Sequence, residues 1–536
     1  MPVPLERAAR AASPGLAIGP VFVLAAAWPA PRPAGTPAEE DAALTASIAA
    51  AIADLAALEA RAQREGADVL AFQIAMLEDP ALSEPARRAI AAGAAAHAAW
   101  PDALAAQIAG CEESADAYFK ARAADLRDVR DRVLRRLLSA GASQPPPAGA
   151  ILLGEDITPS RFLETDWTEG GGIALSAGDP ASRVAMLARA RGVPMVVGLG
   201  ALDPSGHAEA AIDGAGATVI LSPSEQQRAR IMRGRTREAI ARAAQHAVLH
   251  ERAFTAEGQW ISVRLTISGP ADLAGLDPAI CDGIGLARTE LMFRTAEELR
   301  DEERQYHVYR QILDWADGRP VTVRTLDAGA GRPIPGLAIA REDNPALGLR
   351  GIRLSLSQPA SFRIQLRALA RAAAYGPLRV MLPMVTIPEE LEQTRALFAV
   401  VAAELKAERT VAAIPTLGMM VDVPAAALAI ERFDAAFFAI GSDDLTQYVT
   451  ASARDNEAVA ALADPENPAV LRLFAEIARH GRATAAEVSL CGGIAGDPAH
   501  IPSLLAVGIR ALSMAPAAVG PVKSVLAGMR TAHAVG

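Results

Sequence analysis

The sequence predicts an α/β protein whose C-terminal part is a TIM (β/α)8 barrel, and three observations support that fold class. Eight apolar, strand-like runs alternate with helical segments between residues 259 and 536. Roughly 250 residues is the usual length of such a barrel. Several of the runs end in a polar or reactive residue, and these are Arg288, Asp327, Asp422, Asp443, Asp444 and Cys491. Because the C-terminal strand ends of this fold meet at one mouth, we expect their side chains to converge.

Two separated segments, 1–36 and 143–224, are predicted to form one small α/β domain. The first segment reads as a strand that leads into a proline-rich linker. The second carries strand-like runs and one helix at 181–191, after the linker sequence QPPPAG. We expect the two segments to share a core.

Residues 37–142 are predicted to form a helical subdomain inserted between those segments. Apolar residues recur there at helical spacing. Thr36, Pro37 and Glu39 stand in the order of an N-cap, a first-turn proline and a capping box. A further helix within 225–258 is expected to link this half of the chain to the barrel.

Composition narrows the classes of function. The 52 basic and 62 acidic side chains give a net charge of −10, which argues against a sequence-independent nucleic-acid binder. Three cysteines are too few for a disulfide framework or a zinc cluster. No apolar stretch is predicted to cross a membrane, because prolines interrupt the longest one near the start. We therefore expect a cytoplasmic protein that binds neither nucleic acid nor a membrane.

The polar residues at the strand ends indicate a site for a small anion and a metal ion. Arg288 and Arg324 can grip phosphate or carboxylate oxygens through their guanidinium forks. Asp422, Asp443 and Asp444 can hold a hard cation such as Mg²⁺. Taken singly, each residue also fits an ordinary ion pair. As a set on separate strand ends, they favour a binding site.

Cys491 ends a predicted strand and is followed by two glycines. Two interpretations remain open for it: a buried cysteine that packs as a small hydrophobic residue, or a thiol that donates a proton at an anion site. No histidine lies next to it in the sequence, so the pattern does not favour a Cys–His nucleophile.

Six motifs in the barrel segment carry a family resemblance. In chain order they are GIGLARTELMF, VRTLDAGAGRPIP, EDNPALGLRGIR, MVDVPAA, GSDDLTQY and LCGGIAGD. They resemble the phosphoenolpyruvate-binding barrel of enzyme I, the phosphoenolpyruvate–protein phosphotransferase of the bacterial sugar phosphotransferase system. ASPGLAIGPVFVL, ADAYFKARAADLRDVRDRVLRRLL and ILLGEDITPS extend the resemblance to nearly the whole chain. It implies that the small α/β domain is the swivelling, phosphohistidine-type domain of that family.

The resemblance implies a substrate and the residues that hold it. Phosphoenolpyruvate would be bound by a set of arginines, which are Arg288, Arg324, Arg332, Arg350 and Arg454. Arg332 stands where the family usually has lysine, so the charge is kept but the geometry differs.

The resemblance also implies a metal, a proton donor and partners. Asp422 and Asp444 would bind Mg²⁺, and Asp443 and Asp444 would contact the phosphate. Cys491 would protonate the departing enolate to give pyruvate. The family phosphorylates a histidine on the swivelling domain and passes the phosphoryl group to the carrier protein HPr, which docks on the helical subdomain. The barrel is the family's homodimerisation domain.

The phospho-acceptor motif departs from the family pattern Gly-Gly-Arg-Thr-Ser-His. Alignment of LARARGVPMVVG places Arg183 in the histidine position, and Ala181 replaces the threonine that supports it. Arginine stays protonated and has no free lone pair, so it cannot accept a phosphoryl group. Asp179 is expected to cap the helix that follows, with Pro180 at its first position.

Three barrel positions depart as well. Asp422 stands where the family has glutamate and is one methylene shorter, so a water would have to complete the shell of a bound Mg²⁺. Asp443 replaces asparagine, and Gly493 replaces glutamate. The first change adds a negative charge and the second removes one, so the net charge is nearly kept, but the charges stand at different positions. We therefore expect an altered affinity for the anion.

Three hypotheses remain. The first is a working phosphoenolpyruvate–protein phosphotransferase, and the second is a catalytically degenerate relative that binds phosphoenolpyruvate as a regulator or scaffold. The third is a barrel enzyme that keeps chemistry on phosphoenolpyruvate without passing phosphate to a protein. By family, the expectation is a phosphotransferase whose transfer to HPr is impaired. Arg183 and Ala181 favour the second hypothesis, and Cys491 keeps the third open.

Overall fold

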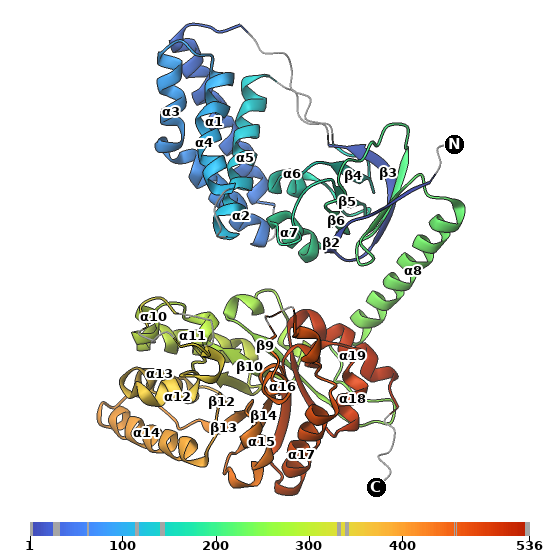
Figure 1. Cartoon of the computed structure of the whole chain (residues 1–536). Coiled ribbons are helices and arrows are strands. Elements are labelled where there is room, and N and C mark those ends of the chain that lie inside the picture. Colours follow the sequence, from blue (N-terminus) through green and yellow to red (C-terminus); the bar gives the residue numbers. More distant parts are fainter. Residues whose placement is uncertain are drawn as a thin grey trace. The chain divides into compact units, whose positions relative to one another are not determined.

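The structure is a computed structural model, and Figure 1 shows the course of the chain. It describes residues 4–24, 33–61, 64–112, 117–139, 145–329, 334–337, 342–454, 456 and 458–530. The chain divides into two compact units, Met1–Ile240 and Ala241–Gly536, and the division falls inside helix α8 (Glu225–Val248). Each unit has a hydrophobic core of its own.

A helical bundle occupies part of the first unit. Its helices are α1 (Pro37–Glu59), α2 (Arg64–Glu78), α3 (Pro80–Ala91), α4 (Ala96–Glu112) and α5 (Ala117–Leu137). The predicted capping box is present at the start of α1. The Thr36 hydroxyl accepts from the Glu39 N–H, and the Glu39 carboxylate accepts from the Thr36 N–H at 2.8 Å. The fully buried Trp100 of α4 contributes to the core of the bundle.

By length and composition alone, α1 could cross a membrane, which the residue pattern did not indicate. Some of its apolar side chains already have partners, because Leu44 and Leu55 are fully buried in the bundle core. The helix packs against α2 and α5. We therefore assign α1 as a core helix of the bundle.

An eight-stranded sheet forms the rest of the first unit. Its strands are β1 (Leu5–Ala8), β2 (Arg10–Ser13), β3 (Leu16–Val23), β4 (Ile151–Gly154), β5 (Gly172–Leu175), β6 (Met195–Val197), β7 (Glu209–Asp213) and β8 (Thr218–Leu221). Their order is β1-β8-β7-β3-β4-β5-β6-β2. β3 pairs with β4 in parallel and with β7 antiparallel, so both chain segments contribute to one sheet. The first segment holds three strands rather than the one expected, because breaks at Ala9 and Pro14–Gly15 divide it.

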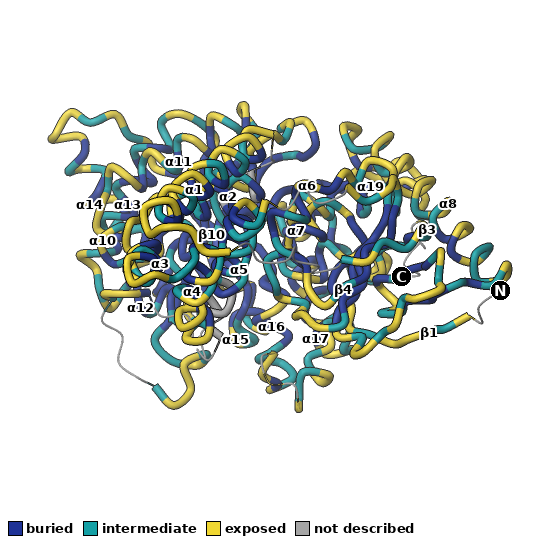
Figure 2. The backbone as a smooth tube through the Cα atoms, turned by 90° about the horizontal axis from the view of Figure 1, so that it is seen from above, coloured by how far each residue is buried: buried dark blue, intermediate teal, exposed yellow. Residues whose placement is uncertain are grey.

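Three helices accompany this sheet. α6 (Pro159–Glu164) and α7 (Arg183–Arg191) share one core with the bundle, to which Phe162 and Leu187 belong. The first half of α8 packs on the sheet through Ile231. Figure 2 shows much of the remaining α8 in the colours of exposed and half-buried residues.

The second unit is a closed barrel of eight parallel strands, as the sequence predicted. The strands are β9 (Ser262–Ile267), β10 (Ile284–Arg288), β11 (Val321–Arg324), β12 (Leu378–Leu382), β13 (Thr416–Val421), β14 (Phe437–Gly441), β15 (Glu487–Cys491) and β16 (Ala511–Met514). β16 pairs with β9 and closes the ring. Each expected strand run corresponds to one strand of the barrel.

Helices surround the barrel on the outside (Figure 1). They are α9 (Thr289–Met292), α10 (Ala296–Arg300), α11 (Glu302–Ala316), α12 (Ile352–Ser357), α13 (Pro359–Ala373), α14 (Pro388–Ala407), α15 (Pro424–Leu428), α16 (Ser442–Thr450), α17 (Pro468–Thr484), α18 (Ile501–Ala506) and α19 (Val519–Gly528). The short helices α9 and α16 begin directly at the C-terminal ends of β10 and β14. They hold the strand-end residues in place at the mouth of the barrel.

Candidate functional site

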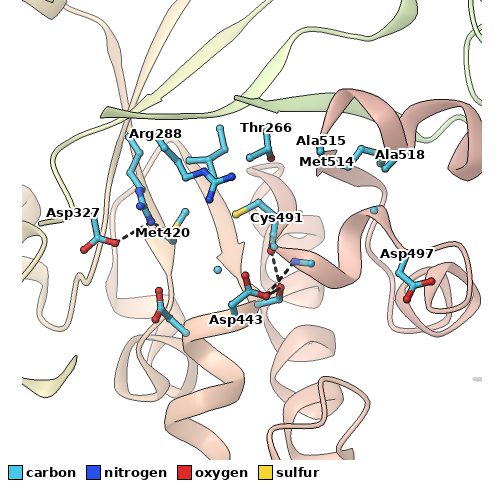
Figure 3. Close-up of a pocket in the computed structure, with 18 of the residues that line it drawn as sticks. Thr266, Arg288, Asp327, Met420, Asp443, Cys491, Asp497, Met514, Ala515 and Ala518 are labelled. Carbon is cyan, nitrogen blue, oxygen red and sulfur yellow. Dashed lines mark hydrogen bonds and ion pairs between the residues drawn. The ribbon is translucent and has the colours of Figure 1, made fainter. Parts of the chain in front are cut away.

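A cavity of about 550 Å³ lies at the C-terminal mouth of the barrel. Eight of the residues predicted from the sequence line it, and these are Arg288, Arg324, Asp327, Arg350, Asp443, Asp444, Arg454 and Cys491. They come from different strands and loops, so the predicted convergence of strand ends is present. Figure 3 shows the Cys491 sulfur beside the space bordered by Arg288, Asp327 and Asp443.

An ion-pair network covers one wall of the cavity. Arg324 donates to Glu290 at 2.6 Å and lies 3.1 Å from Asp327. Arg350 donates to the two Asp327 oxygens at 2.9 and 3.2 Å, and to the two Asp444 oxygens at 3.3 Å each. Burial lowers the pKa of Arg324, but Glu290 and Asp327 outweigh that effect and raise it. The network holds these guanidinium groups in a fixed geometry.

Arg288 differs from the arginines of that network. No carboxylate among the described residues pairs with it, and its Nε atom is buried without a hydrogen-bond partner. Arg288 is half-buried, and a buried donor such as its Nε atom costs free energy unless a ligand supplies the missing acceptor. Arg454 lies nearer the rim, is 40% exposed and donates to Asp444 at 3.1 Å. Arg288 is therefore the main uncommitted anion-binding group of the described mouth.

The turn after Cys491 is tied to the end of β14. The Ser442 hydroxyl donates to the Cys491 carbonyl at 2.8 Å, and the Gly493 N–H donates to Asp443 at 3.1 Å. Gly492 has a φ of +113°, and a Cβ there would lie 2.1 Å from the Ser442 oxygen. Only glycine fits this position, so Gly492 serves the geometry of the turn.

The Cys491 thiol is buried and protonated at neutral pH. It is 3% exposed and donates to the Ile440 carbonyl at a sulfur–oxygen distance of 3.4 Å. Burial raises the thiol pKa to about 12, although Arg324 opposes the shift. A protonated thiol at a cavity wall can act as an acid, whereas a thiolate nucleophile is disfavoured.

Asp422 is placed differently from the other predicted residues. It is fully buried behind the cavity wall, and both of its oxygens accept from the Met384 N–H, at 2.9 and 3.1 Å. Burial and, after it, the nearby carboxylate of Asp444 raise the pKa of Asp422 to about 8. Met384 has a φ of +60°, a strained conformation for this residue type that the Asp422 bond helps to hold.

Some predictions for the mouth lie outside what the structure tests, and some residues were missed. Arg332 falls outside the described residues. Glu290 and Tyr448 were not anticipated, yet Glu290 anchors Arg324 and the Tyr448 hydroxyl accepts from Arg350 at 3.1 Å. Both lie on helices that start at strand ends, α9 and α16. A search of the first residues of each such helix would have found Glu290.

Helix α7 begins later than the sequence suggested. Ser182, and not Asp179, is the N-cap, because its hydroxyl accepts from the Ala185 N–H at 3.2 Å. Asp179 instead accepts from the Ala181 N–H at 2.7 Å and closes a turn before the helix. Arg183 is therefore the first residue of α7.

Arg183 points toward the helical bundle of its own unit. Its guanidinium lies 3.4 Å from Asp125 of α5 and 5.8 Å from the ring centre of Phe72 of α2. Asp125 is fully buried. A positively charged side chain between a carboxylate and an aromatic ring makes both an ion pair and a cation–π contact.

Family models of phosphoenolpyruvate-utilising enzymes match three stretches of the chain. The PEP-binding domain matches residues 242–531, the N-terminal domain matches 8–122, and the mobile domain matches 146–217. The barrel match alone covers more than half of the chain.

Curated proteins named phosphoenolpyruvate-protein phosphotransferase are similar to this chain over most of their length. The protein of Geobacillus stearothermophilus is 36% identical over 91% of this chain and 86% of its own. The protein of Haloferax volcanii is 37% identical over 88% of this chain and 84% of its own. A solved structure of an enzyme I fragment matches 44% of this chain and 99% of its own, at 24% identity and a TM-score of 0.36.

Proposed function

The chain belongs to the enzyme I family of phosphoenolpyruvate–protein phosphotransferases, and we propose that it binds phosphoenolpyruvate in the barrel cavity but fails to pass the phosphoryl group through a histidine. The proposed binding of phosphoenolpyruvate is supported by Arg288, whose partly buried guanidinium is unpaired in a cavity lined by further arginines. The proposed loss of transfer through a histidine is supported by Arg183, which stands in the acceptor position.

The charges of the cavity fit a small molecule with several negative groups. Arg288 offers free donors, and Arg454 is held by one carboxylate at the rim. Guanidinium groups bind phosphate and carboxylate oxygens through paired, charge-assisted hydrogen bonds. A ligand anion would complete the hydrogen bonding of Arg288, which the protein leaves unsatisfied.

We propose Asp422 and Asp444 as the protein ligands of a Mg²⁺ ion. Mg²⁺ is commonly held by one or two carboxylates together with substrate oxygens and waters. Burial and the Asp444 carboxylate raise the pKa of Asp422, and a cation between the two side chains would favour the ionised form of Asp422. A bound Mg²⁺ would neutralise charge on the oxygens of the substrate. The shorter Asp422 is expected to reach the ion less directly than the glutamate of the family.

Cys491 is proposed as the proton donor of the pyruvate-forming step. When the bond between phosphorus and the bridging oxygen breaks, an enolate remains, and the buried thiol can give its proton to the methylene carbon. That bond breaks only when an acceptor takes the phosphoryl group. Without an acceptor, the cavity holds phosphoenolpyruvate and the thiol has no enolate to protonate.

We propose that transfer to a protein is impaired because Arg183 cannot act as a nucleophile. A phosphoryl acceptor needs a nitrogen lone pair, which a neutral imidazole has and a guanidinium lacks. A docking surface for an HPr-like carrier on the bundle, a homodimer through the barrel and a cytoplasmic location are proposed from the family alone.

Labelled phosphoenolpyruvate tests both parts of the proposal. Calorimetric titration with phosphoenolpyruvate and Mg²⁺ should show saturable binding. Incubation with phosphoenolpyruvate labelled in its phosphate should give no acid-labile phosphoprotein. Stable labelling at any histidine would contradict the loss of transfer, and an absence of binding would contradict a phosphoenolpyruvate site.

A variant that restores the acceptor separates the alternatives. Arg183→His combined with Ala181→Thr should recover acid-labile labelling if only the acceptor has been lost. If labelling stays absent while phosphoenolpyruvate still binds, the altered barrel positions are responsible. The degenerate regulator or scaffold, our second candidate, then becomes the better description, because the protein would bind its ligand without turnover.

A further inference from the structure

We propose that Arg183 is a clasp that fastens helix α7 of the sheet subdomain onto the helical bundle through the buried carboxylate of Asp125. The position that carries the phospho-acceptor in the family thus holds a structural contact within the first unit. The clasp does not depend on phosphoenolpyruvate binding, because every residue of it lies in that unit.

The contact joins three elements. Arg183 begins α7, Asp125 lies on α5, and Phe72 and Gln73 lie on α2. The guanidinium is 20% exposed and its partner carboxylate is fully buried. An ion pair between separate elements, closed off from water on the carboxylate side, restrains their relative position.

Arg183 is the principal counter-ion of Asp125. The neighbouring Asp128 is saturated by the Ser160 hydroxyl at 2.6 Å, the Ser160 N–H at 2.8 Å and Gln73 at 3.1 Å. Among the described residues, Asp125 receives only the long bond from Gln73, at 3.4 Å, to one oxygen. Its other oxygen, Oδ2, is buried without a hydrogen bond and lies 3.4 Å from Arg183.

The clasp is expected to depend on pH. Burial raises the pKa of Asp125 to about 6, and the charges that face it are Arg183 from α7 and Arg122 and Asp128 from α5. Because the folded pKa lies above the ordinary value, the ionised carboxylate costs stability at pH 7 and above. That cost declines as the pH falls from about 6 toward the ordinary pKa of 3.8, because the folded carboxyl takes up a proton first. Arg183 offsets the cost, so its contribution is largest where Asp125 is ionised.

The contact also bears on the acceptor position itself. A group that accepts a phosphoryl has to come within bonding distance of its donor. Arg183 instead commits the start of α7 to α5 and α2, because withdrawing it would leave a buried, uncompensated carboxylate. The sheet subdomain and the bundle are therefore expected to move as one body.

Hydrogen–deuterium exchange of the full chain tests the clasp. In Arg183→Gln, the protection of peptides from α5 and α7, corrected for intrinsic exchange, should fall roughly tenfold at pH 7.5, as expected for a partly exposed partner of a buried charge. At pH 5, the loss should be under about threefold, because the protonated Asp125 no longer needs a counter-ion. Barrel peptides, whose protection should not change, serve as the internal reference for folding.

Two further variants make the test specific. Arg191→Gln removes another α7 arginine, which stacks over Phe162 and pairs with no carboxylate among the described residues, so its effect should be the same at both pH values. In an Asp125→Asn background, Arg183→Gln should lose its pH dependence. The clasp is refuted if Arg183→Gln leaves α5 and α7 as protected as before, or if its effect at the two pH values is equal.

Discussion

Arg288 and Arg350 both lie at the mouth of the barrel, but they differ in their carboxylate partners. Arg350 is bonded to Asp327 and Asp444, so its charge is compensated before any ligand arrives. Arg288 has no such partner among the described residues. Removing Arg350 would take one of two arginine partners from each of two buried carboxylates, because Asp327 also pairs with Arg324 and Asp444 with Arg454. Removing Arg288 would take a partner from no carboxylate among the described residues. Arg288 is thus the arginine whose loss should report on ligand binding rather than on folding.

We predict that Arg288→Gln weakens phosphoenolpyruvate binding by roughly 10- to 100-fold, the value of losing charge-assisted hydrogen bonds to an anion. Calorimetric titration measures the affinity for phosphoenolpyruvate. The melting temperature of the variant should differ little from that of the parent protein. Arg353→Gln is the matched control, because Arg353 lies outside the cavity lining and donates to Leu347, Gly348 and Thr386. Equal losses of phosphoenolpyruvate affinity in the two variants would show that Arg288 has no specific role in binding.

At the scale of elements, the sequence predicted the strands better than the contacts between their side chains. Apolar runs and their polar ends located all eight barrel strands, because alternation with helices is a strong signal. The pairing of Arg324 with Glu290 could not be read from the sequence, since it depends on which way two side chains turn at a strand end. The start of α7 was also misplaced, because Asp179 and Ser182 both suit an N-cap.

The opposite end of the barrel shows another cross-strand contact that the sequence did not reveal. Arg264 of β9 donates to both Glu487 oxygens at 2.6 Å, and Arg379 of β12 lies 2.9 Å from the same carboxylate of β15. Burial raises the Glu487 pKa, but the two arginines outweigh it and lower the pKa to about 2. One carboxylate therefore ties three strands together.

We predict that Glu487→Gln destabilises the barrel by about 1–2 kcal/mol at pH 7, a figure reduced because water reaches one side of the carboxylate. A lowered pKa contributes stability that is present above pH 4.5 and is lost as the pH falls toward 2. The difference in unfolding free energy between variant and parent should therefore shrink in urea titrations at pH 3. Glu408→Gln, which breaks the exposed pair with Arg367, should cost less at pH 7. A larger cost for Glu408→Gln would contradict the role of Glu487.

For the whole molecule, the proposed binding site and the proposed acceptor position belong to different units. The cavity and all of its lining residues lie in the second unit, and Arg183 with its clasp lies in the first. Each unit has a separate core, so a change in one does not remove packing from the other. Loss of the acceptor can therefore leave the binding site intact, which is the condition for a degenerate family member that still senses phosphoenolpyruvate.

We predict that residues 249–536, produced alone, fold and bind phosphoenolpyruvate within about twofold of the affinity of the full chain, because every residue that lines the cavity is retained. Circular dichroism and calorimetric titration with Mg²⁺ measure folding and binding. Arg288→Gln in the fragment should lower the affinity by the same factor as in the full chain. A folded fragment that does not bind would mean that the first unit contributes to the site, and the separation of binding from the acceptor position would then fail.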